Sequence, residues 1–217
     1  MSRIFAITAC TLALPGAAFA ATKTYETGNF EGVSVSAGVE ADVTVGPTRS
    51  VTAETSADNF DDLRIAVEGN VLHIGRPNSS WFSGLFSGSR PNYKVHVVTP
   101  ALHSLAVSSG ADVTAKGSVE GDLSVTSSSG SEVDVDGVKG GNVKASSSSG
   151  SEIDIAGSCL SLEAEASSGS DLDAEDLKCE NVTVRASSGS DVSVSASKRV
   201  SGNASSGSDV SIRGRPP

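Results

Sequence analysis

Between residues 108 and 210 the sequence repeats one six-residue phrase six times. It reads Ser-Ser-Gly-Ala-Asp-Val at 108–113, Ser-Ser-Gly-Ser-Glu-Val at 128–133 and Ser-Ser-Gly-Ser-Glu-Ile at 148–153. It continues as Ser-Ser-Gly-Ser-Asp-Leu at 167–172 and as Ser-Ser-Gly-Ser-Asp-Val at 187–192 and 205–210. Successive glycines of the phrase are therefore 20, 20, 19, 20 and 18 residues apart. A period this regular predicts a solenoid, in which each repeat forms one coil.

Apolar residues alternate with polar ones on both sides of each phrase, as in half-buried strands. They lie seven and five residues before each glycine, as in Leu123 and Val125, and three and five residues after it, as in Val133 and Val135. One coil cannot bury these side chains alone, but stacked coils bury them as continuous columns. The sequence thus predicts an all-β, single-domain β-solenoid with about 20 residues per coil, a right-handed β-helix.

A serine stands directly before every repeat glycine. Its parity along the chain matches that of the apolar columns, so we expect these serines to point inward and form a hydrogen-bonded ladder, because an unpaired buried hydroxyl costs about 1–3 kcal/mol. The glycine supplies a turn with positive φ. The predicted ladder consists of Ser109, Ser129, Ser149, Ser168, Ser188 and Ser206.

Residues 21–100 indicate separate short strands rather than tight repeats, so this part is expected to form an irregular start and cap, followed by regular coils over 101–212. A hairpin-type turn is predicted at Glu68-Gly69-Asn70. Residues 76–91 predict a loop that either covers part of the core or is exposed as a binding tip. Its apolar side chains are Trp81, Phe82, Leu85 and Phe86.

The N-terminus has the features of a secretory signal peptide. Arg3 precedes an apolar run over 4–19, and Ala18-Phe19-Ala20 fits a cleavage site before Ala21. A lipobox ending at Cys10 is the competing interpretation. No later stretch approaches the roughly 20 apolar residues of a membrane span. We therefore expect residues 1–20 to be removed and the domain 21–217 to be exported, to the periplasm, the cell surface or the medium.

Two cysteines follow the signal segment, Cys159 and Cys179, each ten residues before a repeat glycine. They occupy the same position of consecutive coils, and stacked strands about 4.7–4.9 Å apart allow a disulfide. In an oxidising compartment we expect a bridge, with two reduced thiols as the alternative.

Carboxylates occupy the second position after each repeat glycine, and some coils add another two residues later. Such a row either stays solvated or binds cations weakly, with calcium as the candidate. The formal net charge of −10 argues against nucleic acid as a partner. The proposed cation strip consists of Glu132, Asp134, Glu152, Asp154, Asp171 and Asp173.

No catalytic constellation stands out in the sequence. The row of acids is repetitive, whereas glycoside hydrolysis needs one acid with a raised pKa. The histidines, His73, His96 and His103, lie in no recognisable motif with serine or cysteine. We expect no catalytic residue, no cofactor and no enzymatic activity, with a carbohydrate-active β-helix enzyme as the alternative.

Several segments together resemble the head GIN domain family, described as putative autotransporter adhesins. They are the opening 30–46 (FEGVSVSAGVEADVTVG), Leu72-His73-Ile74, the entry 97–102 (VVTPAL) and the Ser-Gly-Ser-Asp coils. In the triplet that names the family, Gly38-Val39-Glu40 replaces Gly-Ile-Asn. The resemblance implies an exported bacterial β-helical domain with a surface or adhesive role. We expect a non-enzymatic binding protein whose rigid surface meets an envelope or cell-surface macromolecule or glycan. Open solenoid ends also make self-association possible.

Overall fold

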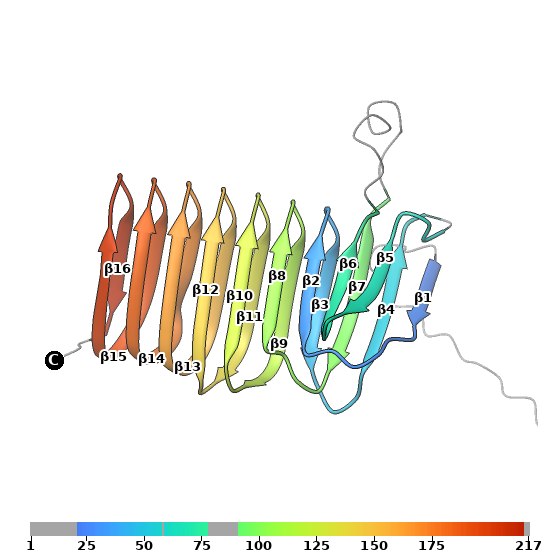
Figure 1. Cartoon of the computed structure of the whole chain (residues 1–217), viewed down its shortest axis with the longest axis horizontal. Helices are drawn as coiled ribbons and strands as arrows, with labels where there is room; N and C mark the ends of the chain where they lie inside the picture. The colour runs from blue at the N-terminus through green and yellow to red at the C-terminus, as the bar shows by residue number, and fades with distance from the viewer. Residues whose placement is uncertain (1–20, 58, 78–90, 215–217) are drawn as a thin grey trace, which may run out of the picture.

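The computed structural model describes residues 21–57, 59–77 and 91–214. Within these ranges it contains sixteen strands, β1 to β16, joined in one sheet, and no helix. The strands form a stack of flattened coils with the repeat turns along one edge (Figure 1). The predicted all-β solenoid is therefore confirmed.

Each coil contributes one strand to each of two faces that meet at the Ser-Gly turns. We call them the front face, which faces the viewer in Figure 1, and the back face. The strands of the front face pair in parallel. They are β2 (Gly32–Ser36), β8 (Ser104–Ser108), β10 (Leu123–Ser128) and β12 (Asn142–Ser148). The longer strands β13 (Glu152–Ser167), β14 (Asp171–Ser187) and β15 (Asp191–Ala204) continue this face with their second halves. The back face contains β3 (Glu40–Val45), β9 (Asp112–Glu120), β11 (Glu132–Lys139), the first halves of β13 to β15, and β16 (Asp209–Arg213), also in parallel.

At the N-terminal end both faces change to antiparallel pairing. On the back face β7 (Tyr93–Thr99) follows β3 in parallel and is then joined antiparallel by β4 (Ser50–Thr55) and β1 (Ala21–Tyr25). On the front face β6 (Val71–Gly75) follows β2 and forms a hairpin with β5 (Arg64–Glu68). Gly69 and Asn70 at its turn have φ of 57° and 71°, as the predicted hairpin requires.

The core is the set of inward columns that the periodicity predicts. Ile153, Ala164 and Val184 are fully or almost fully buried, and the buried residues form one continuous cluster from Phe30 to Ala196. Only the last coil departs from the pattern, because nothing in the described chain covers it. There Val200 and Val210 are partly exposed and Ile212 is 47% exposed.

The predicted serine ladder is wrong in its residues. The serines that precede the glycines are exposed at the tips and have φ of 57–61°, so two successive left-handed residues form each turn. This conformation changes the parity, and the serine after the glycine points inward instead. Ser151 Oγ donates to the carbonyl oxygen of Ser127 at 2.9 Å and accepts the N–H of Ser148 at 3.1 Å. The corrected inner ladder is Ser131, Ser151, Ser170 and Ser190, and the exposed tip serines are Ser109, Ser129, Ser149, Ser168, Ser188 and Ser206.

At the opposite edge of the stack, which we call the base, the chain passes from the back face to the next coil of the front face. Gly137 has φ of 95° there, and a Cβ at this residue would collide with the carbonyl oxygen of Gly117 in the preceding coil. The predicted disulfide is present in the base: Cys159 and Cys179 are in register on β13 and β14, with Cα atoms 4.5 Å apart. It links two consecutive coils covalently.

Candidate functional site

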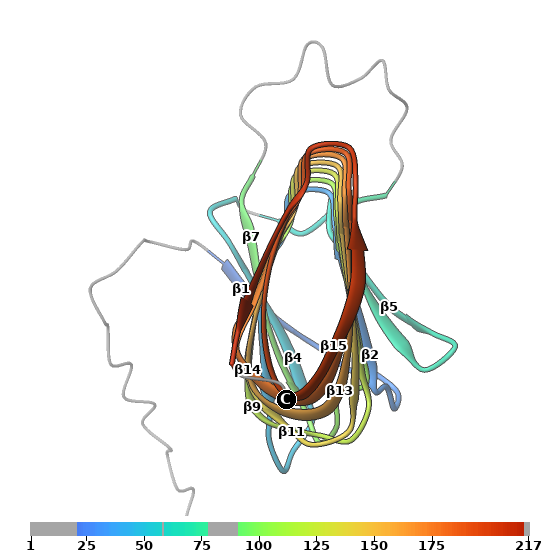
Figure 2. The same cartoon turned by 90° about the vertical axis from the view of Figure 1, so that its left-hand side faces the viewer.

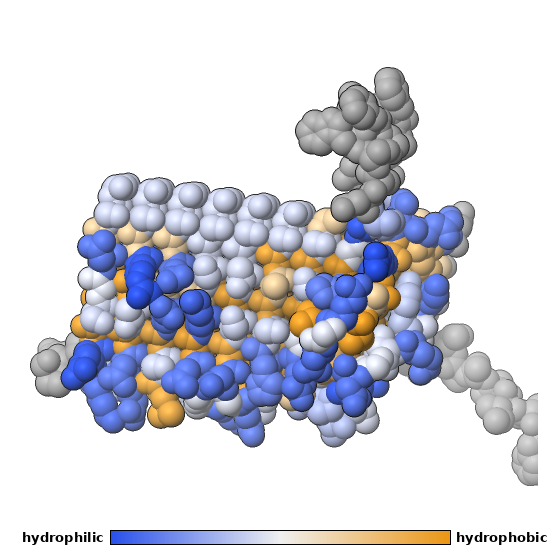
Figure 3. Space-filling model, viewed as in Figure 1, coloured by the Kyte–Doolittle hydropathy of each residue, from blue (hydrophilic) through white to orange (hydrophobic). Residues whose placement is uncertain are grey.

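The front face carries two open depressions that adjoin along the axis of the stack. Their volumes are about 590 and 560 Å³, and both are lined by Thr183 and Arg185. The first extends to Asn203 on β15 and the second to His103 before β8. Figure 3 shows this face, with patches of strongly hydrophilic residues (blue) and bands of hydrophobic ones (orange) below the pale row of Ser-Gly turns. Together the depressions form a groove across six coils, from that of β8 to that of β15, which we call the front groove.

Two columns of outward residues supply many of the polar side chains along the front groove. They lie six and four residues before each repeat glycine, where the alternation along the strand points side chains away from the core. Parallel pairing places equivalent residues of successive coils side by side, about 4.8 Å apart. The first column is Ser124, Lys144, Glu163, Thr183 and Ser201, and the second is Thr126, Ser146, Glu165, Arg185 and Asn203.

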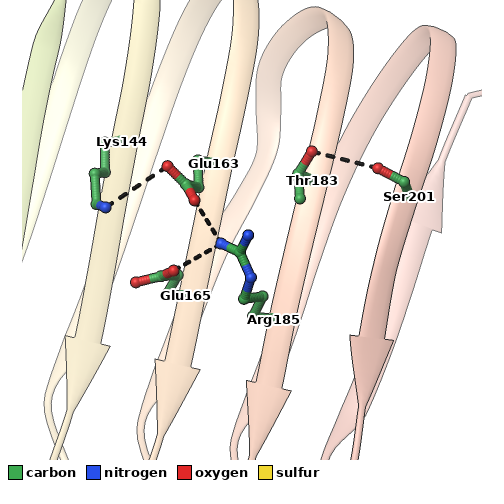
Figure 4. A network of polar contacts seen from close by, with 6 residues as sticks. All are labelled: Lys144, Glu163, Glu165, Thr183, Arg185 and Ser201. Carbon is green, nitrogen blue, oxygen red and sulfur yellow. Dashed lines mark hydrogen bonds and ion pairs between the residues drawn. The ribbon is translucent and has the colours of Figure 1, made fainter.

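At the centre of the front groove two cations and two carboxylates form one network (Figure 4). Arg185 Nη1 donates to Glu163 and, at 2.8 Å, to Glu165, while Lys144 Nζ lies 3.6 Å from Glu163. Hydrogen bonding from Arg185, followed by the charge of Lys144, lowers the pKa of Glu163 below its usual range. The four charges therefore cancel, and the network is neutral overall at physiological pH.

A third column, next to the base, consists of hydrogen-bonded polar side chains. Asp122 Oδ1 accepts from the backbone N–H and the side-chain amide of Asn142, at 2.8 and 2.9 Å. Ser161 Oγ donates to Asn142 Oδ1 at 2.6 Å, and a ring nitrogen of His103 lies 3.1 Å from the carbonyl oxygen of Asp122. These contacts fix the orientation of donors and acceptors before any ligand arrives, which reduces the entropy lost on binding.

This arrangement suits binding better than proton transfer. A general acid in a glycosidase needs a raised pKa so that it is protonated at working pH. The pKa of Glu163 is shifted in the opposite direction, because Arg185 and Lys144 stabilise its charged form. What the front groove offers is a row of hydroxyl, amide and paired charged groups, which can exchange hydrogen bonds with a polar ligand.

The back face carries the acidic columns where the sequence places them. Glu132, Glu152 and Asp171 are in register, as are Asp134, Asp154 and Asp173. Burial and then the charges of Glu152, Asp173, Asp134 and Glu132 raise the pKa of Asp154. No group of three or more His, Cys, Asp or Glu side chains that could hold a metal ion is found over residues 21–57, 59–77 and 91–214. Weak calcium binding by the strip stays a prediction.

The N-terminal part of the back face differs, since basic residues lie among its acids. Lys94 Nζ contacts Glu40 at 2.5 Å and Asp42 at 3.1 Å, and His96 Nδ1 lies 3.2 Å from Asp42. These contacts compensate the acids of β3, whereas the acids of β11 and β13 face one another in register.

Other predicted sites lie outside the described residues. These are the signal segment 1–20 and the side chains of Trp81, Phe82, Leu85 and Phe86. The front groove was not predicted from the sequence. Its signal was present, because the outward positions six and four residues before each glycine could have been compared between coils in the same way as the acidic positions after it.

The part of the chain in the structure contains no helix that is long and apolar enough to cross a membrane.

Comparison with known proteins places these features in a wider group. A family model described as "Putative auto-transporter adhesin, head GIN domain" matches residues 29–216. A search of curated proteins finds no match.

Solved structures with the same fold include a "putative adhesin" from Bacteroides fragilis NCTC 9343, with TM-score 0.78, 14% identity and coverage of 90% of this chain and 89% of that one. A "putative adhesin" from Parabacteroides merdae ATCC 43184 has TM-score 0.61 and 12% identity, covering 90% and 94%. A "Putative lipid binding protein" from Parabacteroides distasonis ATCC 8503 has TM-score 0.60 and 16% identity, covering 91% and 94%. At these identities the similarity shows the fold alone.

Proposed function

The chain belongs to the head GIN domain family, and on this premise we propose that it is an exported, non-enzymatic attachment protein that binds an extended glycan along the front groove. The observation that carries the proposal is the groove itself, two adjoining depressions with oriented polar side chains over six coils. The family description supports the exported location, and it supports a binding role over catalysis.

A glycan fits the chemistry of the front groove for two reasons. A polysaccharide presents hydroxyl groups at regular intervals, and the groove presents donors and acceptors at every coil, about 4.8 Å apart. The central network is neutral overall, so it does not require a charged ligand. The net charge of −10 for the whole chain disfavours nucleic acid.

The lining residues of the front groove also set the expected strength of binding. None of them is Phe, Tyr or Trp, so no large aromatic ring is present to stack on a sugar and we expect hydrogen bonds to supply most of the affinity. Each such bond contributes only about 0.5–1.5 kcal/mol net, because water competes for the same groups. We therefore expect weak binding by one groove and stronger attachment by several grooves acting together.

The proposal can be tested by affinity electrophoresis of residues 21–217 in gels that contain neutral, acidic or basic polysaccharides. Arg185→Ala should abolish the retardation by a bound polysaccharide, because it removes the donor that orients Glu163 and Glu165. The matched control is Arg64→Ala, which removes another exposed, ion-paired arginine on the β5–β6 hairpin and should leave retardation unchanged. Lack of retardation by every polysaccharide, or an equal loss in both variants, would contradict a glycan-binding groove.

A carbohydrate-active enzyme is the second candidate, since Glu163 and Glu165 are two carboxylates in one groove. The lowered pKa of Glu163 argues against it as a general acid. Release of reducing ends from a retarded polysaccharide by the purified protein, lost in Glu163→Gln, would favour the enzyme over the attachment protein.

A further inference from the structure

Among the described residues, the C-terminal end of the stack has two strands that are each paired on one side only. The second half of β15 pairs with β14, and β16 pairs with the first half of β15. Figure 2 looks onto this end, where the coil is a flattened loop, narrow at the Ser-Gly turn and broad at the base. Unpaired edges of this kind are templates for pairing with another chain.

The same end exposes apolar side chains that every other coil buries. Val200, Val210 and Ile212 continue columns that are almost fully buried elsewhere, yet Ile212 is 47% exposed. They line a depression of about 170 Å³ together with Val184 and Ala204. Hence both unpaired backbone groups and apolar surface lie at one place.

The N-terminal end is finished differently. Its last strands, β1 and β5, are antiparallel to their neighbours. Figure 2 shows β5 diverging from the outline of the coils, so this end does not match the cross-section of the C-terminal end. A copy stacked head to tail would therefore meet a surface of another shape.

The C-terminal end of a second copy, turned to face the first, does match it in shape. The second half of β15 runs towards the Ser-Gly turn and β16 runs away from it, because they are consecutive strands around that turn. Consider a two-fold axis that runs from the Ser-Gly turn to the base, perpendicular to the axis of the stack. Rotation about it leaves the directions of the strands unchanged and exchanges the front and back faces. Each β15 then lies antiparallel beside the partner's β16, with narrow edge on narrow edge. A two-fold axis perpendicular to the faces would instead place the narrow edge over the broad base.

The side chains agree with this arrangement. If residues at equal distances from the Ser-Gly turn are opposed, Val200 would face the partner's Ile212 and Gly202 would face the partner's Val210 on the inner side. On the outer side, Ser201 would face the partner's Ser211 and Asn203 would face the partner's Asp209. The one like-charge pair is Arg199 with the partner's Arg213, and in each copy Arg213 is held by Glu175 at 2.7 Å.

We propose that two copies of this chain form a two-fold dimer through their C-terminal ends, with β15 of each paired antiparallel to β16 of the other. Both edges are satisfied at once, and the cores join into one. Such an interface is isologous and closed, so it yields dimers and no longer filaments. The dimer places two front grooves in one particle.

The first test is the molar mass of residues 21–217 in solution, by light scattering after size exclusion. The wild type should have twice the chain mass, and Ile212→Lys should halve it, because two lysines would be buried at the interface. Leu160→Lys is the matched control, since Leu160 is an equally large apolar residue, 54% exposed, located at the base. It should leave the dimer intact. A monomeric wild type, a larger assembly, or equal behaviour of the two variants would overturn the proposal.

A second test fixes the geometry and does not depend on destabilising the chain. Opposed Cβ atoms in antiparallel strands are about 4.5–5.5 Å apart, close enough for a disulfide to form with small adjustments. The double variant Ser201→Cys with Ser211→Cys should therefore oxidise to a covalent dimer on a non-reducing gel. Within one copy these residues are on opposite outer faces and cannot meet. Ser201→Cys alone should stay monomeric on the gel, and a cross-link there, or none in the double variant, would refute this pairing.

Discussion

The front and back faces have the same backbone and the same repeat but present opposite surfaces. On the front face the outward columns mix hydroxyl, amide, acidic and basic groups, and the charged ones pair with each other around Arg185. On the back face the outward column is acidic in every coil, so each carboxylate has carboxylate neighbours. Because backbone pairing and inward residues hold the coils together, outward residues can differ between the faces, and this difference separates the proposed binding surface from a repulsive one.

The largest expected effect comes from the core that both faces share. Ile153→Ala removes a fully buried side chain and should lower the free energy of unfolding by about 2–5 kcal/mol, from lost burial and the resulting cavity. Ile212→Ala makes the same substitution in the last coil, where the side chain is 47% exposed, and should cost less. Denaturant titration of both variants, at a protein concentration low enough to give monomers, measures the two losses of unfolding free energy and checks that the loss at Ile153 is larger. Equal losses would mean that the end coil is packed as tightly as the interior.

The next largest effect on stability is expected at the base, where the two faces join. Replacing Cys159 and Cys179 together by alanine opens a covalent loop of 20 residues and should cost about 3 kcal/mol, chiefly through greater freedom of the unfolded chain. Thermal unfolding of the double variant, compared with the oxidised wild type, measures this loss. The reduced wild type should unfold at nearly the same temperature as the variant, and a fully stable reduced protein would show that the bridge adds nothing.

Much of this architecture can be predicted from sequence because inward positions obey a strict rule. Val133 and its equivalents must be apolar in each coil, and the cysteine pair follows from the same register. The orientation of Ser129 could not be predicted by counting, since the alternation fails where two left-handed residues follow each other. The front groove was not predicted because its lining residues differ between successive coils, as Lys144, Glu163 and Arg185 do, whereas the periodicity was followed only at positions where the coils agree.

The smallest expected effect tests the repulsion on the back face. Asp154 has a raised pKa, chiefly from burial and then from Glu152, Asp173, Asp134 and Glu132. Its folded pKa exceeds the unfolded value, so its charged form opposes folding. That penalty is absent below the ordinary aspartate pKa, about 3.9, and it develops as the pH rises through the folded value. Asp154→Asn should therefore raise the melting temperature by a few degrees or less at pH 7, and the gain should vanish in acid.

Asp191→Asn supplies the control for this variant, because Asp191 is on the same acidic face, in the neighbouring column with Asp171, yet is not among the groups that raise the pKa of Asp154. It should give a smaller gain at pH 7. The discriminating quantity is the difference between the two variants as a function of pH. A gain from Asp154→Asn that persists at acid pH would point to packing rather than charge. A loss at pH 7 would mean that the carboxylate is stabilised there, as it would be by a cation bound to the strip.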